Sequence, residues 1–99
     1  MQLLDCIKNI KKIPDTTIKI STERFINIIS DYKSKDIKHL IRLVQKYPPS
    51  TRALLGAILD ELNLEKYTET LFKTLNPITK YNIGINEDIL THSNKWNLL

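Results

Sequence analysis

Hydrophobic residues recur every three to four positions through most of the chain, a spacing that predicts helices. The first helical stretch, MQLLDCIKNIKKI, is ended by Pro14 and Asp15, because proline removes a backbone donor. Helical spacing then returns in four further stretches: from Ser21 to about Tyr32, over 34–47, over 51–63 and over 64–75. The pattern therefore predicts a mainly helical protein with four to five helices.

Three shorter stretches alternate polar and apolar residues, as half-buried strands do. TTIKIS, at 16–21, is rich in β-branched residues, and Ser21 at its end is suited to cap the helix that follows. The other two alternating stretches lie near the carboxyl end, at 80–85 and 95–99. Together the three predict a small antiparallel sheet packed on the helices, and hence an α+β fold formed as a single domain over residues 1–99.

The segment after the double proline is apolar around nearly its whole circumference from Ala53 to Leu59. Such a helix must be covered by neighbours on several sides, so it is predicted to be the central core helix. Gly56 in the middle costs about 1 kcal/mol relative to alanine, which favours close packing of another backbone over it. The run is far shorter than the ~20 residues needed to cross a bilayer, and no membrane segment is expected.

The helix over 34–47 separates apolar from basic residues. Its apolar residues share one face, and the opposite face carries a cationic stripe of Lys35, Lys38, Arg42 and Lys46. Such a stripe can contact phosphates, since each neutralised phosphate adds affinity independent of sequence. The alternative is an ordinary solvated helix surface.

Charge is unevenly distributed along the 99 residues, whose net charge is +4. Residues 1–47 hold ten Lys/Arg against five Asp/Glu, whereas 48–99 hold five against six. A basic surface of this kind can meet a nucleic acid or an acidic protein, or neither. The single cysteine, Cys6, suits a reducing compartment, and we expect a cytoplasmic protein.

Residues that commonly carry catalysis or bind metals are sparse. Cys6, His39 and His92 are tens of residues apart, and the two histidines are predicted to be surface residues. The two glycines are isolated and make no phosphate loop. We therefore expect no catalytic, cofactor-binding or metal site.

Three further stretches occur in a distinctive order: IKISTERFINIIS (18–30), YPPSTRALLGAILDELN (47–63), and LNPITKYNIGI with KWNLL (75–85 and 95–99). This order resembles the C-terminal domain of the antitoxins of type IV abortive-infection toxin–antitoxin systems, over about residues 16–98. In that family a strand leads into a Ser-x-Glu-Arg helix start, and a closing sheet ends in a tryptophan strand. The matching positions, which we interpret as fold-defining, are Ser21, Glu23, Arg24, Arg52, Leu55 and Gly56.

The resemblance implies a protein without enzymatic activity that neutralises a nucleotidyltransferase-type toxin. The family's N-terminal winged helix, which binds operator DNA, is not matched, so operator binding by that route is not expected. The first hypothesis is therefore an antitoxin-like interaction module whose basic stripe faces a protein or a nucleic acid. The alternatives are a stand-alone basic nucleic-acid-binding protein and, third, an enzyme with Asp, Tyr and His groups converging in a pocket.

Overall fold

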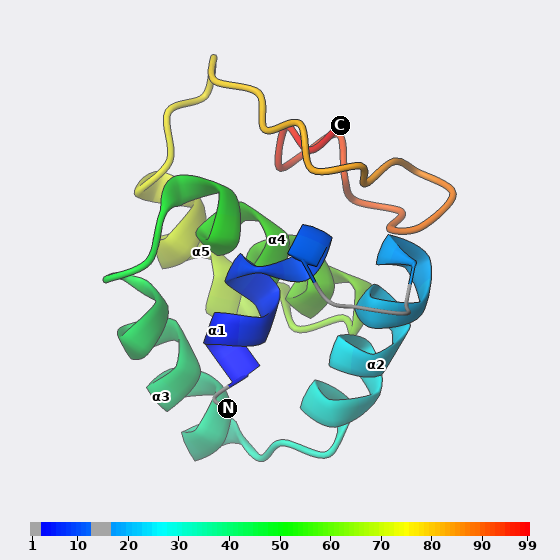
Figure 1. Cartoon of the computed structure of the whole chain (residues 1–99). Helices are drawn as coiled ribbons and strands as arrows, with labels where there is room; N and C mark the ends of the chain where they lie inside the picture. The colour runs from blue at the N-terminus through cyan, green and yellow to red at the C-terminus, as the bar shows by residue number, and fades with distance from the viewer. Residues whose placement is uncertain (1–2, 13–16) are drawn as a thin grey trace.

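Helices make up most of the computed structural model, which describes residues 3–12 and 17–99 (Figure 1). Five α-helices and one short 3-10 helix, η1, lie in this part of the chain. In chain order they are α1 (Leu3–Lys8), η1 (Ile10–Lys12), α2 (Ile18–Ser30), α3 (Ser34–Val44), α4 (Pro49–Glu61) and α5 (Glu65–Lys73). The prediction of four to five helices is confirmed for these residues, while Pro14 and Asp15, the predicted end of the first helix, lie outside them.

The predicted sheet is wrong. Over the described ranges the chain forms no strand beyond one isolated bridge between Tyr81 and Leu98, and that bridge is parallel rather than antiparallel. Gly84 and Asn97 adopt positive φ angles of 78° and 57°, and these turns break both segments before a ladder can extend. Residues 74–99 therefore form an irregular segment, tied together by a few backbone hydrogen bonds such as Tyr81 N–H to Asn97 O at 2.8 Å.

The predicted first strand is largely helix. Residue 16 lies outside the described residues, and Thr17 is the N-cap of α2, where its Oγ1 accepts from the Ile20 N–H at 3.2 Å. Ser21, the predicted cap, is buried within the helix. The β-branched residues favoured a strand locally, but Ser21, Phe25 and Ile29 repeat at helical spacing and bury one face of α2.

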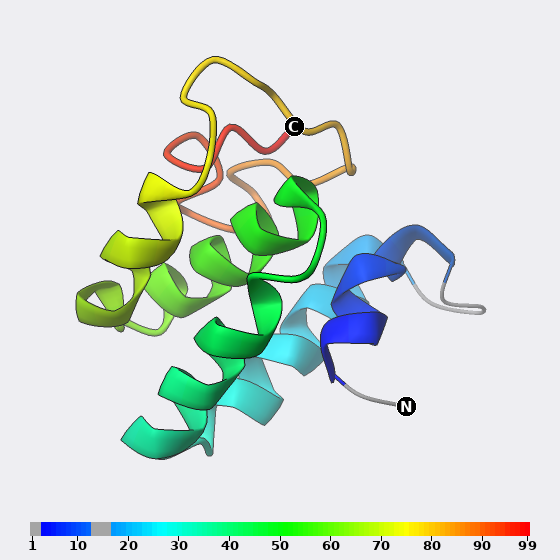
Figure 2. The same ribbon diagram turned by 90° about the vertical axis from the view of Figure 1, so that its left-hand side faces the viewer.

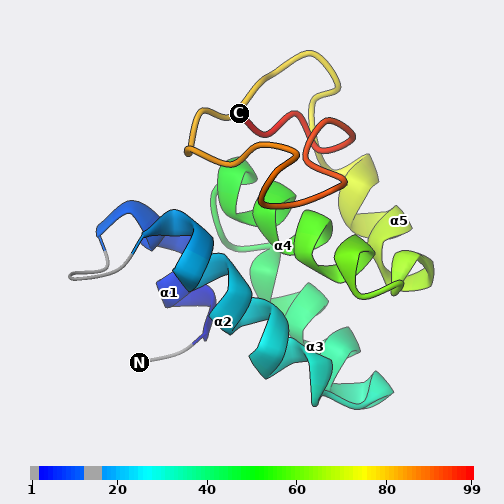
Figure 3. The same cartoon turned by 90° about the vertical axis from the view of Figure 1, so that its right-hand side faces the viewer.

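The prediction that the segment after the double proline forms the core is confirmed. Every residue of α4 from Ala53 to Asp60 is buried. Three helices cover it, since α1, α2 and α5 all pack against α4, whereas α3 packs against α5. Figures 2 and 3 show α4 in the middle of the molecule, with residues 74–99 across its upper side and α3 at the opposite end.

One buried carboxylate fastens the irregular segment to α4. Asp60 is fully buried, and its Oδ2 accepts from Trp96 Nε1 and from Lys95 Nζ, both at 2.8 Å. Its Oδ1 accepts from Thr68 Oγ1 of α5 at 2.9 Å. The indole of Trp96 covers Gly56, so the close neighbour of this glycine is a ring rather than the backbone that was expected. We call Gly56, Asp60, Lys95 and Trp96 the Trp96 clasp.

Candidate interaction site

Helix α3 carries the candidate site because its two sides differ sharply in chemistry. Ile37, Leu40 and Val44 are buried. At the start of the helix, the Asp36 carboxylate accepts from the Lys33 N–H at 3.1 Å, which satisfies an amide that the helix leaves free. Burial of the apolar face fixes the rotation of α3, so its basic side chains project away from the core.

The four basic residues of the predicted stripe are all exposed. Lys35, Lys38 and Arg42 lie on α3, and Lys46 lies in the turn that follows it. The ion pairs within the described residues are Lys73–Glu69, Lys95–Asp60 and His92–Glu61, the last of which requires a protonated histidine. None of them involves the four, which we call the α3 cationic face, so its charge is left for an outside anion.

Toward α5, the cationic face is joined by an aromatic side chain. Tyr67 Oη donates to Ser34 Oγ at 2.8 Å, and Lys66 Nζ lies 5.1 Å from the centre of the Tyr67 ring. Once Tyr67 ionises, the Ser34 hydroxyl donates to its oxygen, which lowers the pKa of Tyr67; the charges of Lys66 and Lys38 lower it further, against the opposing effect of partial burial. Lys66 therefore extends the basic surface from α3 onto α5.

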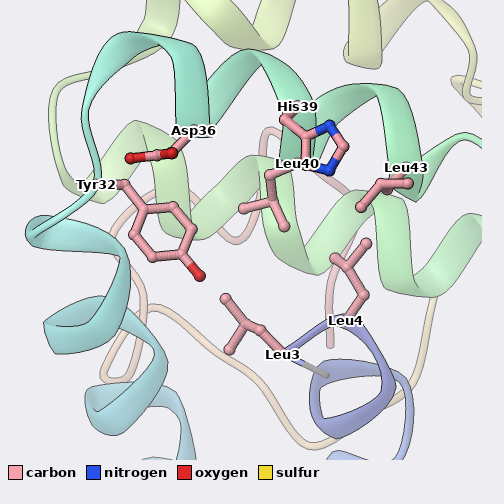
Figure 4. A pocket seen from close by; sticks show the side chains of 7 residues that line it. All are labelled: Leu3, Leu4, Tyr32, Asp36, His39, Leu40 and Leu43. Atoms are coloured by element: carbon pink, nitrogen blue, oxygen red, sulfur yellow. The ribbon is translucent and has the colours of Figure 1, made fainter. Parts of the chain in front are cut away.

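On its other side, α3 borders an open groove shared with α1 (Figure 4). Leu3 and Leu4 point from α1 toward Leu40 and Leu43 of α3 in this view. The groove has a volume of about 500 Å³, and its lining residues are Leu3, Leu4, Tyr32, Asp36, His39, Leu40 and Leu43. We call it the α1–α3 groove. It places an apolar floor directly beside the cationic face.

A hydrogen bond holds α1 to the chain that leaves α3. Tyr47 Oη donates to Asp5 Oδ1 at 2.7 Å, and both residues are partly buried. This hydrogen bond raises the pKa of Tyr47, and burial and the negative charge of Asp5 act in the same direction. Neither residue lines the groove, but the contact ties its α1 wall to the turn that follows α3.

The family-matching positions do not join this site. On α2, Ser21 is buried and Glu23 and Arg24 are exposed. On α4, Leu55 and Gly56 are buried. Arg52 Nη1 donates to Thr74 Oγ1 at 2.9 Å and to Thr74 O at 3.3 Å, which ties the start of α4 to the end of α5. Leu55 and Gly56 therefore lie in the core and Arg52 joins two helices, while the fold-defining role of the six positions stays a prediction.

The sequence patterns predicted neither the α1–α3 groove nor the position of Tyr67 beside the α3 cationic face. Asp36, Leu40 and Leu43 follow one another at the i, i+4, i+7 spacing of a helix edge, a signal that was present in the sequence. Nothing in the sequence indicated that α1 would form the opposite wall. His39 is exposed, as predicted, but it also lines the groove.

No group of three His, Cys, Asp or Glu side chains gathers at metal-binding distance in the part of the chain that the structure describes. Within the same part, every helix is too short or too polar to cross a membrane. A scan of protein-family models gives no matching family, and searches of curated proteins and of solved structures give no match. The function is therefore argued from the geometry of the site.

Proposed function

We propose that this protein is an interaction module, rather than an enzyme, that binds an acidic partner protein through α3. The observation that carries the proposal is the α3 cationic face, whose four exposed charges lack ion pairs within the described residues. Cations held in a row repel one another. An anionic surface that covers them relieves this repulsion and lowers the free energy, which favours binding.

The neighbouring groove favours a protein as the partner. Protein interfaces combine an apolar centre with a polar or charged rim, and the α1–α3 groove beside the cationic face offers both. The phosphate backbone of a nucleic acid would engage the charges and would leave the apolar floor uncovered.

The resemblance to type IV antitoxins supplies the first partner to test, a nucleotidyltransferase-type toxin in the cytoplasm. Its opening feature, a strand before Ser21, is helix α2 in the structure, and its closing sheet is reduced to one isolated bridge, so the likeness now depends on residues 47–63. Neutralisation by direct contact needs no catalytic group on the module.

Co-expression with a nucleotidyltransferase encoded beside this gene tests the proposal. We expect the protein to restore growth, and the double variant Lys35→Glu with Arg42→Glu to lose this protection. The matched control is Lys19→Glu with Lys80→Glu, which reverses two exposed charges on α2 and on the irregular segment. Equal protection by both double variants, or none by the unaltered protein, contradicts the proposal.

A second candidate function is nucleic-acid binding. The specific observation in its favour is Tyr67, an aromatic ring placed beside Lys66 and Lys38, as on surfaces that stack bases between phosphate contacts. A salt titration with random duplex and single-stranded DNA separates the two candidates. Four phosphate contacts predict a log–log slope of about −3 to −4, whereas absent binding removes this candidate.

A further inference from the structure

We infer that the α1–α3 groove is the docking site for an acidic amphipathic helix of the partner protein. The inference rests on the proposed function, because it assigns the kind of segment that the α3 cationic face meets. The proposed function uses the groove only to favour a protein over a nucleic acid, whereas the inference names the kind of segment that occupies it.

The shape of the groove favours a helix. The two walls are themselves helices, α1 and α3, and an amphipathic helix lying in such a hollow is a common mode of recognition. Along α3 the lining runs from Asp36 to Leu43, about 10 Å at 1.5 Å per residue, which matches two turns of a bound helix. A partner strand is disfavoured, since the described residues offer no sheet edge on which to add one.

The floor of the groove supplies the apolar contact. Leu4 and Leu40 are buried, while Leu3 and Leu43 are only partly covered. In Figure 4, Leu3 lies across the hollow from Leu40, and Leu4 lies across from Leu43. A partner helix laid along the hollow would remove the remaining apolar surface of Leu3 and Leu43 from water. Leucine-sized residues at i, i+3 or i+4, and i+7 of the partner fit this spacing.

The rim sets the charge of the partner. At about 100° per residue, His39 is the nearest exposed position to Leu43 around α3, and Lys35 and Arg42 come next. A helix seated in the groove would therefore present its outer flank to these cations, and acidic residues there would be attracted. Asp36 lies at the beginning of α3, so a basic residue on the partner is best placed at that end.

A synthetic peptide tests the inference with the full-length protein. The probe is a fluorescein-labelled helix of about four turns, with leucines along one stripe and glutamates on both flanks. We expect it to bind, and Leu43→Asp to weaken binding at least about tenfold, the loss typical of a central apolar contact. Leu3→Asp provides a second disruption from the opposite wall, should Leu43→Asp impair folding.

The matched control is Ile28→Asp, which places the same charge on an apolar residue of α2 that is 46% exposed. The Kd of this variant for the peptide should stay within about twofold of that of the unaltered protein, because residues outside an interface change the affinity little. Two control peptides complete the design: one replaces the leucines by serines, and the other replaces the glutamates by lysines. Both should bind at least about tenfold more weakly.

The outcomes separate the groove from the proposed function. Equal binding of the serine peptide overturns the docking site but leaves the cationic face as a contact surface. Equal binding of the lysine peptide overturns the acidic character of the partner. Absent binding of all peptides overturns the inference, while the growth assay independently decides the proposed function. Dimerisation that is abolished by Leu43→Asp, measured by analytical ultracentrifugation, shows instead that a second copy occupies the groove and also overturns it.

Discussion

The ring of Trp96 lies so close to Gly56 that a Cβ added at Gly56 would fall 2.3 Å from Trp96 Cη2. This contact joins the middle of the core helix to a residue forty positions later, and it closes the irregular segment over α4. Residues 74–99, which include Lys95 and Trp96, lie across the side of α4 that faces away from α3 (Figures 2 and 3), so variants of Lys95 and Trp96 should change stability with little direct effect on a partner at α3.

Gly56→Ala should destabilise the protein, although alanine normally favours a helix by about 1 kcal/mol over glycine. The added methyl group must displace the buried Trp96 ring, and overpacking of a core costs about 1–3 kcal/mol. Urea denaturation measures the free energy of unfolding. The cost should shrink in a Trp96→Phe background, where the ring is smaller, and an equal cost in both backgrounds contradicts the direct contact.

Asp60→Asn should lower the free energy of unfolding by about 1–3 kcal/mol, because the neutral amide cannot satisfy Trp96 Nε1, Lys95 Nζ and Thr68 Oγ1 together. Lys95→Met should cost less, because the buried carboxylate keeps the hydrogen bonds from Trp96 and Thr68 and loses only a donor whose side chain is 42% exposed. Thermal unfolding followed by circular dichroism compares the two. A larger loss from Lys95→Met than from Asp60→Asn would contradict this order. It would show that the charge of Lys95 contributes more than the hydrogen bonds that Trp96 and Thr68 donate to Asp60.

Stability should fall in strongly alkaline solution through Tyr47. Its folded-state pKa is raised above the ordinary value of 10.0, chiefly by the hydrogen bond to Asp5. The stabilisation is therefore fully present below this ordinary value and is lost as the pH rises through the raised pKa. Tyr47→Phe should remove this alkaline loss, as measured by urea denaturation on either side of pH 10.0.

Ionisation of Tyr67 should have the opposite effect on stability, because its folded-state pKa is lowered from 10.0. The stabilisation from ionised Tyr67 is fully present above the unfolded-state pKa and is lost as the pH falls through the lowered pKa. The Tyr47 experiment is therefore best done in a Tyr67→Phe background. Ultraviolet titration should show that Tyr67→Phe removes the tyrosine that ionises first and Tyr47→Phe one that ionises late; the reverse order contradicts the two contacts.

The helices could be predicted from the sequence because each has a clear period and end signals. The run from Ala53 to Leu59 has no polar side, so it had to lie in the core, and Pro48 with Pro49 separates α3 from α4. At residues 18–21 the prediction failed because the β-branched residues favour a strand locally, and burial of Ser21, Phe25 and Ile29 against the rest of the chain overrides that preference.

The basic half of the candidate site could be predicted from the same helical period, but the groove could not. Exposure of Lys35, Lys38 and Arg42 follows from the helical period alone, whereas the groove depends on α1 packing beside α3, a contact between distant segments. The two C-terminal stretches alternate as strands do, but positive φ angles at Gly84 and Asn97 turn the chain. The hydrogen bond from Trp96 to Asp60 joins distant segments, and no local pattern predicts it.

Mapping the binding surface by nuclear magnetic resonance tests the role of α3 most directly. Titrating the acidic leucine-striped peptide into isotope-labelled protein should shift the amide signals of α1 and α3, around Leu3, His39 and Leu43, and leave those of the Trp96 clasp unchanged. Shifts confined to α2 or to residues 74–99, or a complete absence of shifts, would contradict the assignment of α3 as the contact surface.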